Sequence, residues 1–474
     1  MKIRSIKFDK HNIFGDLFFD FCDDFGNPYD NIFLIGENGT GKSLILNLIY
    51  QLSRDYLFSL QYNQEPGIEI DIQLENFDRD FIINEIKGHD FKNVSRVIVN
   101  LTKSRELKII NDTGEEKVYD LENEKELENI SKLFFIDYIN ADEFAEPPSI
   151  DLGRGRKFLN SSSWDLKNKI INNLHDMQVS DDLDLAYWVK NNMGKELDVT
   201  KIDYKISRFK NAINSFFSSK KYYGLYETYS HAQKNVYFEE SDRKITVNDL
   251  SSGEKNIILK SMFMIKKGGS SPVVLLDEPE NSMHPLWQMK IVDFYMDLIN
   301  SGKNQKQLFI ATHSPYIFKN HISDTSTFFI MKRDINNKIV FININNKKTG
   351  LFPWSPSWGE INYFAYGIVT PELHDELYGY IHEKYISNAS DEEDAKKRSG
   401  QLYFDSNYLQ LKISPEYKWT REYKGVAQES ENVTLPTFIR NKMHHPENKI
   451  MQKISFTDSE LKTSIDKLIS FLSD

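Results

Sequence analysis

The stretch Gly36-Glu37-Asn38-Gly39-Thr40-Gly41-Lys42-Ser43 fits the pattern G-x-x-x-x-G-K-[ST] of a phosphate-binding loop. Its glycines let backbone N–H groups close around a phosphate, and the N-terminus of a following helix adds partial positive charge. Lys42 is expected to reach the β- and γ-phosphates of a nucleotide, and the Ser43 hydroxyl is expected to bind Mg²⁺. The pattern therefore predicts a nucleotide site made of Gly36, Asn38, Gly39, Gly41, Lys42 and Ser43.

The sequence around this loop has the strand and the helix that the motif requires. Residues 32–35 are apolar and β-prone, which is typical of a buried parallel strand, and residues 44–49 follow with a helical pattern. Residues 273–276 and 308–311 are two further apolar runs of the same kind. Strands that alternate with helices over the first 330 residues predict an α/β sheet domain.

Polar groups follow both of the later apolar runs. Asp277 and Glu278 come directly after the first, and we expect Asp277 to hold Mg²⁺ through water and Glu278 to orient or deprotonate the attacking water. An acidic turn after a core strand is the alternative when the pair is taken alone. His313 follows the second run and is a candidate sensor of the γ-phosphate, although a lone histidine at a strand end is more often structural.

A second candidate anion site lies in the polar segment 250–255, which reads Leu-Ser-Ser-Gly-Glu-Lys and precedes a helical run. Its hydroxyls, its glycine N–H and the helix N-terminus favour an anion. The residues predicted to form this site are Ser251, Ser252, Gly253 and Glu254. Taken as an isolated hexapeptide, the segment is an ordinary helix cap.

Together and in this order, the four elements resemble the ATP-binding-cassette ATPases, with the LSGGE signature at residues 250–254 and the switch histidine at His313. The Gly-Glu-Asn-Gly start, the loop 280–285 and Ala-Thr-His-Ser-Pro are similar to the RecF/SMC/OLD-type branch. One departure is Ser252, where the family usually has Gly. The glutamine of the family's Q-loop is not identifiable, and residues 140–143 are a weak candidate region.

The resemblance implies that ATP and Mg²⁺ are the cofactors and that subunits pair head to tail, as a homodimer or a higher even oligomer. Each ATP would then be buried between Lys42 of one subunit and Ser252 and Gly253 of the partner subunit. ATP would join the subunits and hydrolysis would release them, which is a ligand-biased switch between two states.

The predicted fold is an ABC-type P-loop ATPase domain with a helical insertion, followed by a mainly α-helical C-terminal domain. We assign residues 1–150 and 240–345 to the ATPase domain and the polar residues 151–239 to the insertion, which lacks a heptad run long enough for a coiled-coil arm. Residues 350–474 form the predicted C-terminal domain, in which Thr370-Pro371-Glu372 is a strong helix start.

The composition limits the remaining possibilities. A net charge of −11 argues against a general electrostatic grip on nucleic acid, so any such contact needs a local basic patch. The single cysteine, Cys22, excludes a disulfide framework within the chain. The apolar runs are short and no signal peptide is recognisable, so we expect a cytoplasmic protein without a membrane span.

The segment 434–448 carries Arg440 and His445 at the spacing R-x4-H, with Asn441 directly after the arginine. Pro446 predicts that the helix ends at His445, where the helix dipole favours a charged imidazole. An arginine that holds a phosphodiester and a histidine that moves protons are what metal-independent RNA cleavage needs. Residues offered as assistants are His374, His382, His444 and Glu447.

This segment resembles the HEPN ribonuclease motif, which implies catalytic roles for Arg440, Asn441 and His445 and RNA, such as tRNA, as a substrate. The spacing alone is uninformative, because about one R-x4-6-H match is expected by chance in this chain. A helix end at which the arginine and histidine cap carbonyls or meet surface acids is therefore the alternative.

Three functions stay open. The first is an ATP-gated ribonuclease of anti-phage defence, similar to PrrC-type anticodon nucleases. The second is a sensor ATPase that regulates a separate nuclease, as in Septu- or PARIS-like systems. The third is a RecF-like DNA-associated ATPase, for which the lysines at 167, 169, 205, 210, 220 and 221 are candidate contacts and solvated helix faces the simpler explanation.

Overall fold

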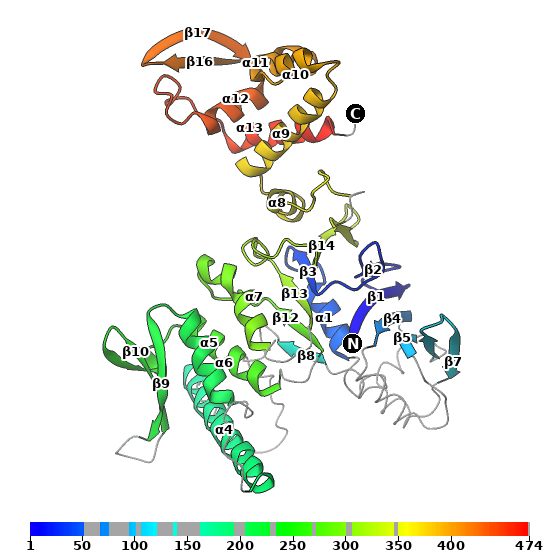
Figure 1. The fold of residues 1–474 in the computed structure, drawn as a ribbon, viewed down its shortest axis with the longest axis vertical. Coiled ribbons are helices and arrows are strands. Elements are labelled where there is room, and N and C mark those ends of the chain that lie inside the picture. The colour runs from blue at the N-terminus through cyan, green and yellow to red at the C-terminus, as the bar shows by residue number, and fades with distance from the viewer. Residues whose placement is uncertain are drawn as a thin grey trace. The chain divides into compact units, whose positions relative to one another are not determined.

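The structure is a computed structural model, and it describes residues 1–51, 67–74, 94–100, 106–120, 136–139, 162–193, 204–227, 234–267, 272–299, 306–345 and 349–472. The chain divides into two compact units, whose elements Figure 1 shows. Unit 1 comprises Met1–Thr327 and Arg333–Val340, and unit 2 comprises Phe328–Lys332 and Phe341–Asp474.

A six-stranded sheet in the order β15-β14-β3-β13-β12-β8 carries the phosphate loop. Its strands are β3 (Asn31–Gly36), β8 (Ile136–Ile139), β12 (Val273–Asp277), β13 (Gln307–Thr312), β14 (Ser326–Arg333) and β15 (Ile339–Asn343). The pairs β3–β13, β13–β12 and β12–β8 are parallel. Every residue of β3, β12 and β13 is buried, as expected for parallel strands covered on both faces. The three apolar runs of the sequence are these three strands.

Unit 1 also contains two antiparallel sheets. The first has the order β2-β1-β4-β5-β6-β7 and consists of β1 (Lys2–Asp9), β2 (Phe18–Asp20), β4 (Gly67–Gln73), β5 (Val94–Asn100), β6 (Glu106–Asn111) and β7 (Glu116–Asp120). The second has the order β11-β10-β9 and consists of β9 (Lys220–Glu227), β10 (Lys234–Glu240) and β11 (Arg243–Thr246). Buried and half-buried residues alternate along β4, the period-2 pattern of a sheet with one covered face.

The described helices of unit 1 are α1 (Lys42–Gln51), α4 (Ser162–Asn191), α5 (Lys205–Phe216), the short η3 (Val247–Asp249), α6 (Ser252–Lys267) and α7 (Pro285–Ile299). The segment 151–239 is thus helical in α4 and α5, which lie side by side in Figure 1. Asp181 of α4 caps α5, because its carboxylate accepts hydrogen bonds from Lys205 N at 2.9 Å and Ile206 N at 3.0 Å. The last part of this segment forms β9 and β10 instead, since aromatic residues such as Tyr222 and Phe238 favour strands.

Unit 2 is mainly helical and contains one hairpin. Its elements after β15 are α8 (Trp358–Tyr366), α9 (Pro371–Ser387), α10 (Glu392–Arg398), α11 (Gln401–Asn407), η4 (Leu409–Leu411), β16 (Tyr417–Tyr423), β17 (Val426–Val433), α12 (Leu435–His444) and α13 (Asp458–Ser470). Thr370 caps α9 by accepting a hydrogen bond from Leu373 N at 3.2 Å, with Pro371 at the first helical position, as the sequence predicts. Apolar side chains of α9, α12 and α13, among them Leu377, Phe438 and Ile465, are buried in its core.

In the part of the chain that the structure describes, none of the helices combines the length and the apolar character that crossing a membrane requires.

One histidine is fully buried in the core of unit 2. His374 of α9 places its Nε2 2.9 Å from Ser464 Oγ of α13, while its Nδ1 has no hydrogen-bond partner among the described residues. Burial lowers the pKa of His374 to about 4, because a charged imidazole would lose its hydration there.

This histidine predicts a loss of stability in mild acid. The unfolded chain takes up a proton near pH 6.5 and the folded chain only near 4, so the free energy of unfolding falls between these values as the pH is lowered. The expected loss is roughly 1 kcal/mol per pH unit, and it is absent above pH 6.5. Denaturant titrations measure the free energy of unfolding at about pH 7.5 and about pH 5.5. Between these two pH values the free energy of unfolding should fall more for the wild type than for His374→Gln. Equal losses would contradict the prediction.

Candidate nucleotide site and C-terminal pocket

The phosphate loop lies between β3 and α1, and its lysine is folded into it. Lys42 Nζ donates hydrogen bonds to the carbonyl oxygens of Gly36 at 2.8 Å and Glu37 at 2.9 Å. Burial lowers the pKa of Lys42, although three nearby acids, Glu278, Asp277 and Glu280, act in the opposite direction. Gly41 has a φ of +90°, and a Cβ there would lie 2.9 Å from the ring of Phe14, so the loop needs glycine at this position.

The predicted Mg²⁺ ligands meet across the sheet. Ser43 Oγ donates a hydrogen bond to Asp277 Oδ1 at 3.0 Å, and Tyr138 of β8 donates its hydroxyl hydrogen to Asp277 Oδ2 at 3.1 Å. Burial raises the pKa of Asp277, and these two hydrogen bonds oppose that shift. Hydroxyl and carboxylate oxygens are the ligands that Mg²⁺ prefers, so Ser43 and Asp277 fit this ion. Tyr138 belongs to no sequence motif. Its contact with Asp277 becomes visible only in the folded chain, where β8 pairs with β12.

Glu278 and His313 lie together at the carboxyl ends of β12 and β13. His313 Nδ1 is 3.4 Å from Glu278 Oε1, and both side chains are partly exposed. Glu278 has a φ of +42°, and its N–H donates to the carbonyl oxygen of Ala311 at 2.9 Å. A non-glycine residue with positive φ is uncommon and costs free energy, so the fold places this carboxylate at the expense of local strain.

A buried acid that the sequence did not single out connects these loops. Glu280 Oε1 accepts hydrogen bonds from Thr312 Oγ1 at 2.5 Å, His313 N at 3.1 Å and Ser314 N at 3.2 Å. Burial raises the pKa of Glu280, while these hydrogen bonds favour its charged form. The loop after β12 therefore holds the backbone that carries His313. The acid two residues after Glu278 in Asp-Glu-Pro-Glu was the available signal.

The signature segment is a capped helix start. Ser251 N and Ser251 Oγ both donate to Glu254 Oε2, at 2.7 and 2.9 Å, and Glu254 N donates to Ser251 Oγ at 3.3 Å. This reciprocal pattern is a capping box at the start of α6. Lys220 Nζ lies 2.7 Å from Glu254 Oε1. Burial acts to raise the pKa of Glu254, but the hydrogen bonds from Lys220 and Ser251 outweigh it and lower that pKa.

The two central signature residues differ in their surroundings. Ser252 is exposed, so its hydroxyl is accessible at the N-terminus of α6. Gly253 is buried against the loop after β12, and a Cβ on it would lie 2.5 Å from the carbonyl oxygen of Ser282. The segment that the sequence predicts as an anion site therefore also packs against the Asp277–Ser282 loop of its own chain.

Two of the lysines considered as candidate DNA contacts, Lys205 and Lys220, form ion pairs with acidic side chains. Lys205 Nζ is 2.9 Å from Asp184 Oδ2, and Lys220 Nζ is 2.7 Å from Glu254 Oε1. Their charges are therefore partly neutralised, which leaves less positive charge for a phosphate backbone. The candidate Q-loop region, residues 140–143, lies outside the described residues.

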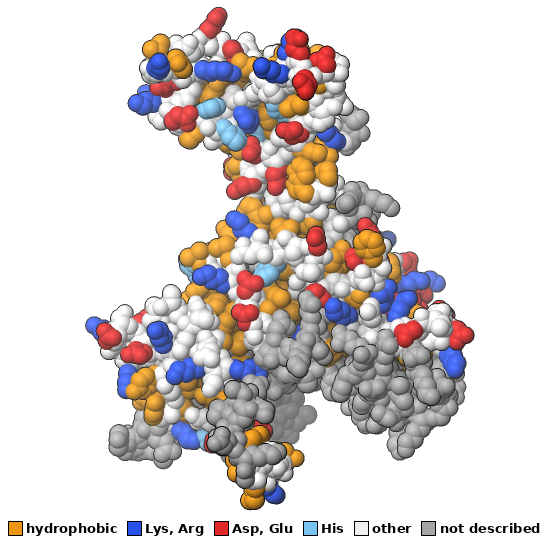
Figure 2. All heavy atoms as spheres, viewed as in Figure 1, with side chains coloured by type: hydrophobic (Ala, Val, Ile, Leu, Met, Phe, Trp, Pro, Cys, Tyr) orange, Lys and Arg blue, Asp and Glu red, His pale blue; other side chains and the backbone are white. Residues whose placement is uncertain are grey.

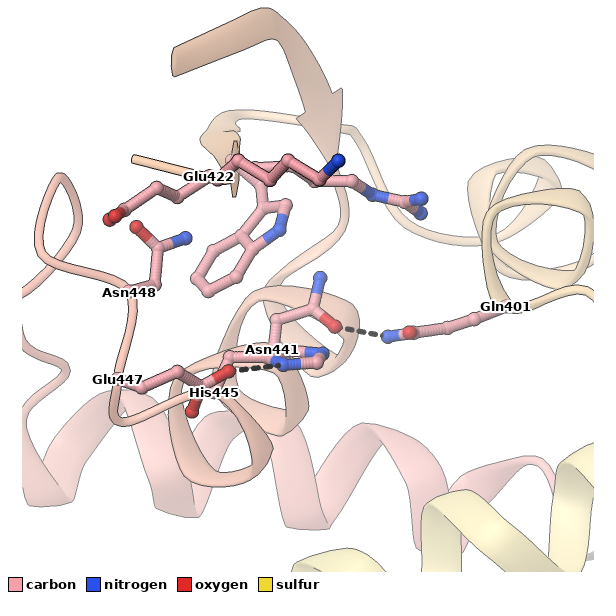
Figure 3. Close-up of a pocket in the computed structure, with 9 residues that line it drawn as sticks. Gln401, Glu422, Asn441, His445, Glu447 and Asn448 are labelled. Carbon is pink, nitrogen blue, oxygen red and sulfur yellow. Dashed lines mark hydrogen bonds and ion pairs between the residues drawn. The ribbon is translucent and has the colours of Figure 1, made fainter. Parts of the chain in front are cut away.

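The HEPN-like segment borders a cavity of about 480 Å³ in unit 2 (Figure 3). Helix α12 ends at His444 and His445 is its C-cap, which confirms the predicted helix end. The side chains of Asn441 and His445 line the cavity. His445 Nδ1 is 3.2 Å from Glu447 Oε1, and a hydrogen on Nδ1 directed at this carboxylate leaves the lone pair of the neutral imidazole on Nε2.

The side-chain amide of Gln401 is hydrogen-bonded to both Arg440 and Asn441. Gln401 of α11 accepts a hydrogen bond from Arg440 Nη1 at 2.8 Å and donates one to Asn441 Oδ1. The guanidinium carbon of Arg440 lies 5.6 Å from the centre of the Tyr378 ring, within the range of a cation–π contact. Gln401 lines the cavity together with Asn441 and His445, whereas Arg440 is not one of its lining residues and is connected to it through the Gln401 amide. The sequence carries no motif for Gln401.

The other candidate histidines have different partners. His444 Nε2 is 2.6 Å from Asp375 Oδ1, His382 Nε2 is 2.9 Å from the carbonyl oxygen of Arg398, and His374 is buried against Ser464. None of the three lines the cavity, whereas Glu447 does.

Residues 32–319 match the family described as "AAA domain, putative AbiEii toxin, Type IV TA system". The chain belongs to this AAA family. The match covers more than half of the 474 residues and contains the phosphate loop, the signature segment, the acidic pair and His313. This AAA protein is therefore a P-loop ATPase.

Comparison with known proteins gave distant structural likenesses. No curated protein matches the chain. An SMC head bound to the C-winged helix domain of ScpA is 14% identical, with a TM-score of 0.43 over 72% of this chain and 98% of the other. The SMC head domain from Thermotoga maritima is 12% identical, with a TM-score of 0.37 over 73% of this chain and 99% of the other.

The signature glycine provides a test of the packing around the site. Gly253→Ala is expected to lower the free energy of unfolding by about 1–3 kcal/mol, because the added methyl group meets the Ser282 carbonyl oxygen. Ser252→Ala is the matched control, since this neighbouring side chain is exposed and its truncation should leave stability unchanged. Urea titrations of the three proteins measure the difference. A Gly253→Ala protein as stable as the control would show that this contact is not present.

Proposed function

We propose that this AAA-family ATPase is a dimerising switch of bacterial anti-phage defence whose ATP state controls RNA cleavage at the C-terminal pocket. The proposal is carried by Asn441 and His445, which line one polar cavity together with Gln401 and Glu447. Arg440 donates a hydrogen bond to Gln401, and Glu447 lies 3.2 Å from His445. The family description, which names a putative AbiEii toxin and a type IV TA system, supports a toxin-like role, and we place this role in the cytoplasm as part of the proposal. The proposed domains are residues 1–150 with 240–345, the insertion 151–239 and the HEPN-like residues 350–474.

The nucleotide side of the proposal uses the edge of the parallel sheet. Lys42 would exchange the carbonyl oxygens of Gly36 and Glu37 for phosphate oxygens when ATP binds. Ser43 and Asp277 would hold Mg²⁺, which neutralises charge that develops on the phosphates. Glu278 would orient or deprotonate the attacking water, and His313, 3.4 Å from it, would contact the γ-phosphate.

The exposed signature residue supports a dimer that closes around ATP. Ser252 lies at the N-terminus of α6, where a helix presents unpaired N–H groups and partial positive charge. A γ-phosphate bound to a second copy of the chain would complete this anion site. A homodimer or a higher even oligomer places the two sites symmetrically.

The proposed cleavage is a transfer within the RNA backbone. A ribose 2′-hydroxyl attacks the adjacent phosphorus, the bond to the 5′-oxygen of the next nucleotide breaks, and a 2′,3′-cyclic phosphate and a 5′-hydroxyl form. His445 Nε2 would take the proton from the 2′-hydroxyl and return it to the leaving 5′-oxygen, while Glu447 keeps the imidazole in the required tautomer. Arg440 would stabilise the extra negative charge on the phosphorane, with Gln401 fixing its position.

The test is RNA cleavage by matched histidine variants. We expect the purified protein to cleave total tRNA and expect His445→Ala and Arg440→Ala to lose at least about 100-fold of that rate while they keep ATP hydrolysis. His444→Ala is the matched control, because this adjacent imidazole binds Asp375 and does not line the cavity. Fragment ends should be cyclic phosphate and 5′-hydroxyl.

Two results would contradict the proposal. Cleavage that survives in both His445→Ala and Arg440→Ala would place the activity elsewhere. Intact ATP hydrolysis without any RNA cleavage would instead favour a sensor ATPase that regulates a separate nuclease.

A further inference from the structure

One wall of the C-terminal cavity is the hairpin β16–β17. Trp419, Arg421, Glu422 and Lys424 of this hairpin all line the cavity. In a regular strand, neighbouring residues point to opposite faces, so Arg421 and Glu422 should not share a cavity. The pairing register shifts between Thr420 and Glu422, so the strict alternation of the strand is interrupted at Arg421, and both Arg421 and Glu422 line the cavity.

Two other residues of the hairpin, Thr420 and Tyr423, do not line the cavity. Thr420 Oγ1 lies 2.8 Å from Ser430 Oγ on the paired strand, and the side chain of Tyr423 is exposed. Trp419 is buried, with its ring centre 6.2 Å from that of His445, so it forms the back wall of the cavity next to the predicted acid–base group. Arg421, which is exposed, therefore lines the same cavity as His445.

The acidic and the basic residues that line the cavity differ in whether they have partners. Its two carboxylates already have partners, because Glu422 accepts a hydrogen bond from Lys449 N at 2.8 Å and Glu447 interacts with His445. Figure 3 shows both carboxylates with Asn448 on the side opposite Gln401. Arg421 and Lys424 are exposed, and in the described part of unit 2 neither forms an ion pair with an acid. The ammonium of Lys424 lies 5.4 Å from the centre of the Tyr423 ring.

This local arrangement matters because the surrounding surface is not basic. Figure 2 shows Lys and Arg side chains interspersed with Asp and Glu on the visible face of unit 2. The chain as a whole has a net charge of −11. A polyanion therefore gains attraction only where cations stand without acids, and Arg421 and Lys424 are such a pair beside His445.

Building on the proposed function, we propose that the β16–β17 hairpin is a phosphate-binding arm, in which Arg421 and Lys424 hold backbone phosphates of a single-stranded RNA next to the bond that is cleaved. The cavity of about 480 Å³ is within the usual range for bound ligands and admits part of one strand. Attack by the 2′-hydroxyl needs a backbone freed from the A-form helix, which an unpaired loop provides. Phosphate contacts carry no base information, so the arm sets affinity and strand position rather than sequence preference.

The test measures binding rather than cleavage. A fluorescent 2′-O-methyl oligonucleotide cannot be cleaved, because its attacking oxygen is blocked, and its anisotropy reports binding to the full-length protein at several salt concentrations. We expect Arg421→Gln with Lys424→Gln to weaken binding about tenfold or more and to reduce the salt dependence by about 1.4 in the log–log slope. Lys418→Gln is the matched control, because Lys418 lies on the same strand, is exposed and does not line the cavity.

The outcomes separate this inference from the proposed function. Weaker binding with a smaller salt slope in the double variant supports the arm, even when no RNA is cleaved. The absence of cleavage would overturn only the proposed function. Unchanged affinity and slope in a folded double variant overturn the arm, even when cleavage depends on His445. Equal binding of a blunt duplex of the same sequence also overturns it, because the inference requires an unpaired strand.

Discussion

The hydrogen bond from Ser43 Oγ to Asp277 Oδ1 joins two parts of the chain that are 234 residues apart in sequence. It exists because β3, β13 and β12 run parallel, so their carboxyl ends meet at one edge of the sheet. The phosphate loop, the acidic pair and His313 each follow one of these strands. Register errors in the sheet would therefore separate the groups that must act on one nucleotide.

The loops at this edge are also connected to one another. Glu280 binds the backbone that carries His313, and the carbonyl oxygen of Ser282 packs against Gly253 at the start of α6. A movement of the loop after β12 would therefore displace both His313 and the start of α6. Packed elements with few alternative arrangements transmit such movements as discrete changes, which is what a nucleotide-dependent switch requires.

Much of the nucleotide site could be predicted from the sequence, because its residues follow directly on apolar strands or belong to a compact motif such as Gly36–Ser43. Tyr138 of this site and Gln401 of the C-terminal pocket could not, since each is a single residue that only the folded chain brings to its partners. Glu280 was missed although it follows the acidic pair by two residues. The hairpin β16–β17 was missed because the first seven residues of β17 are exposed and lack the alternation of a half-buried strand. The capping role of Ser251 and Glu254 was one of two interpretations that the sequence left open.

The central claim is that the nucleotide state of the ATPase sets the activity of the C-terminal pocket. The most direct test uses Glu278→Gln, which should bind ATP without hydrolysing it, and follows the tRNA cleavage rate while ATP is titrated. The account predicts a rate that changes with ATP and then stays constant at saturation, because the bound state no longer decays, whereas the wild type returns to its starting rate as ATP is consumed. A cleavage rate independent of ATP in both proteins would contradict the claim.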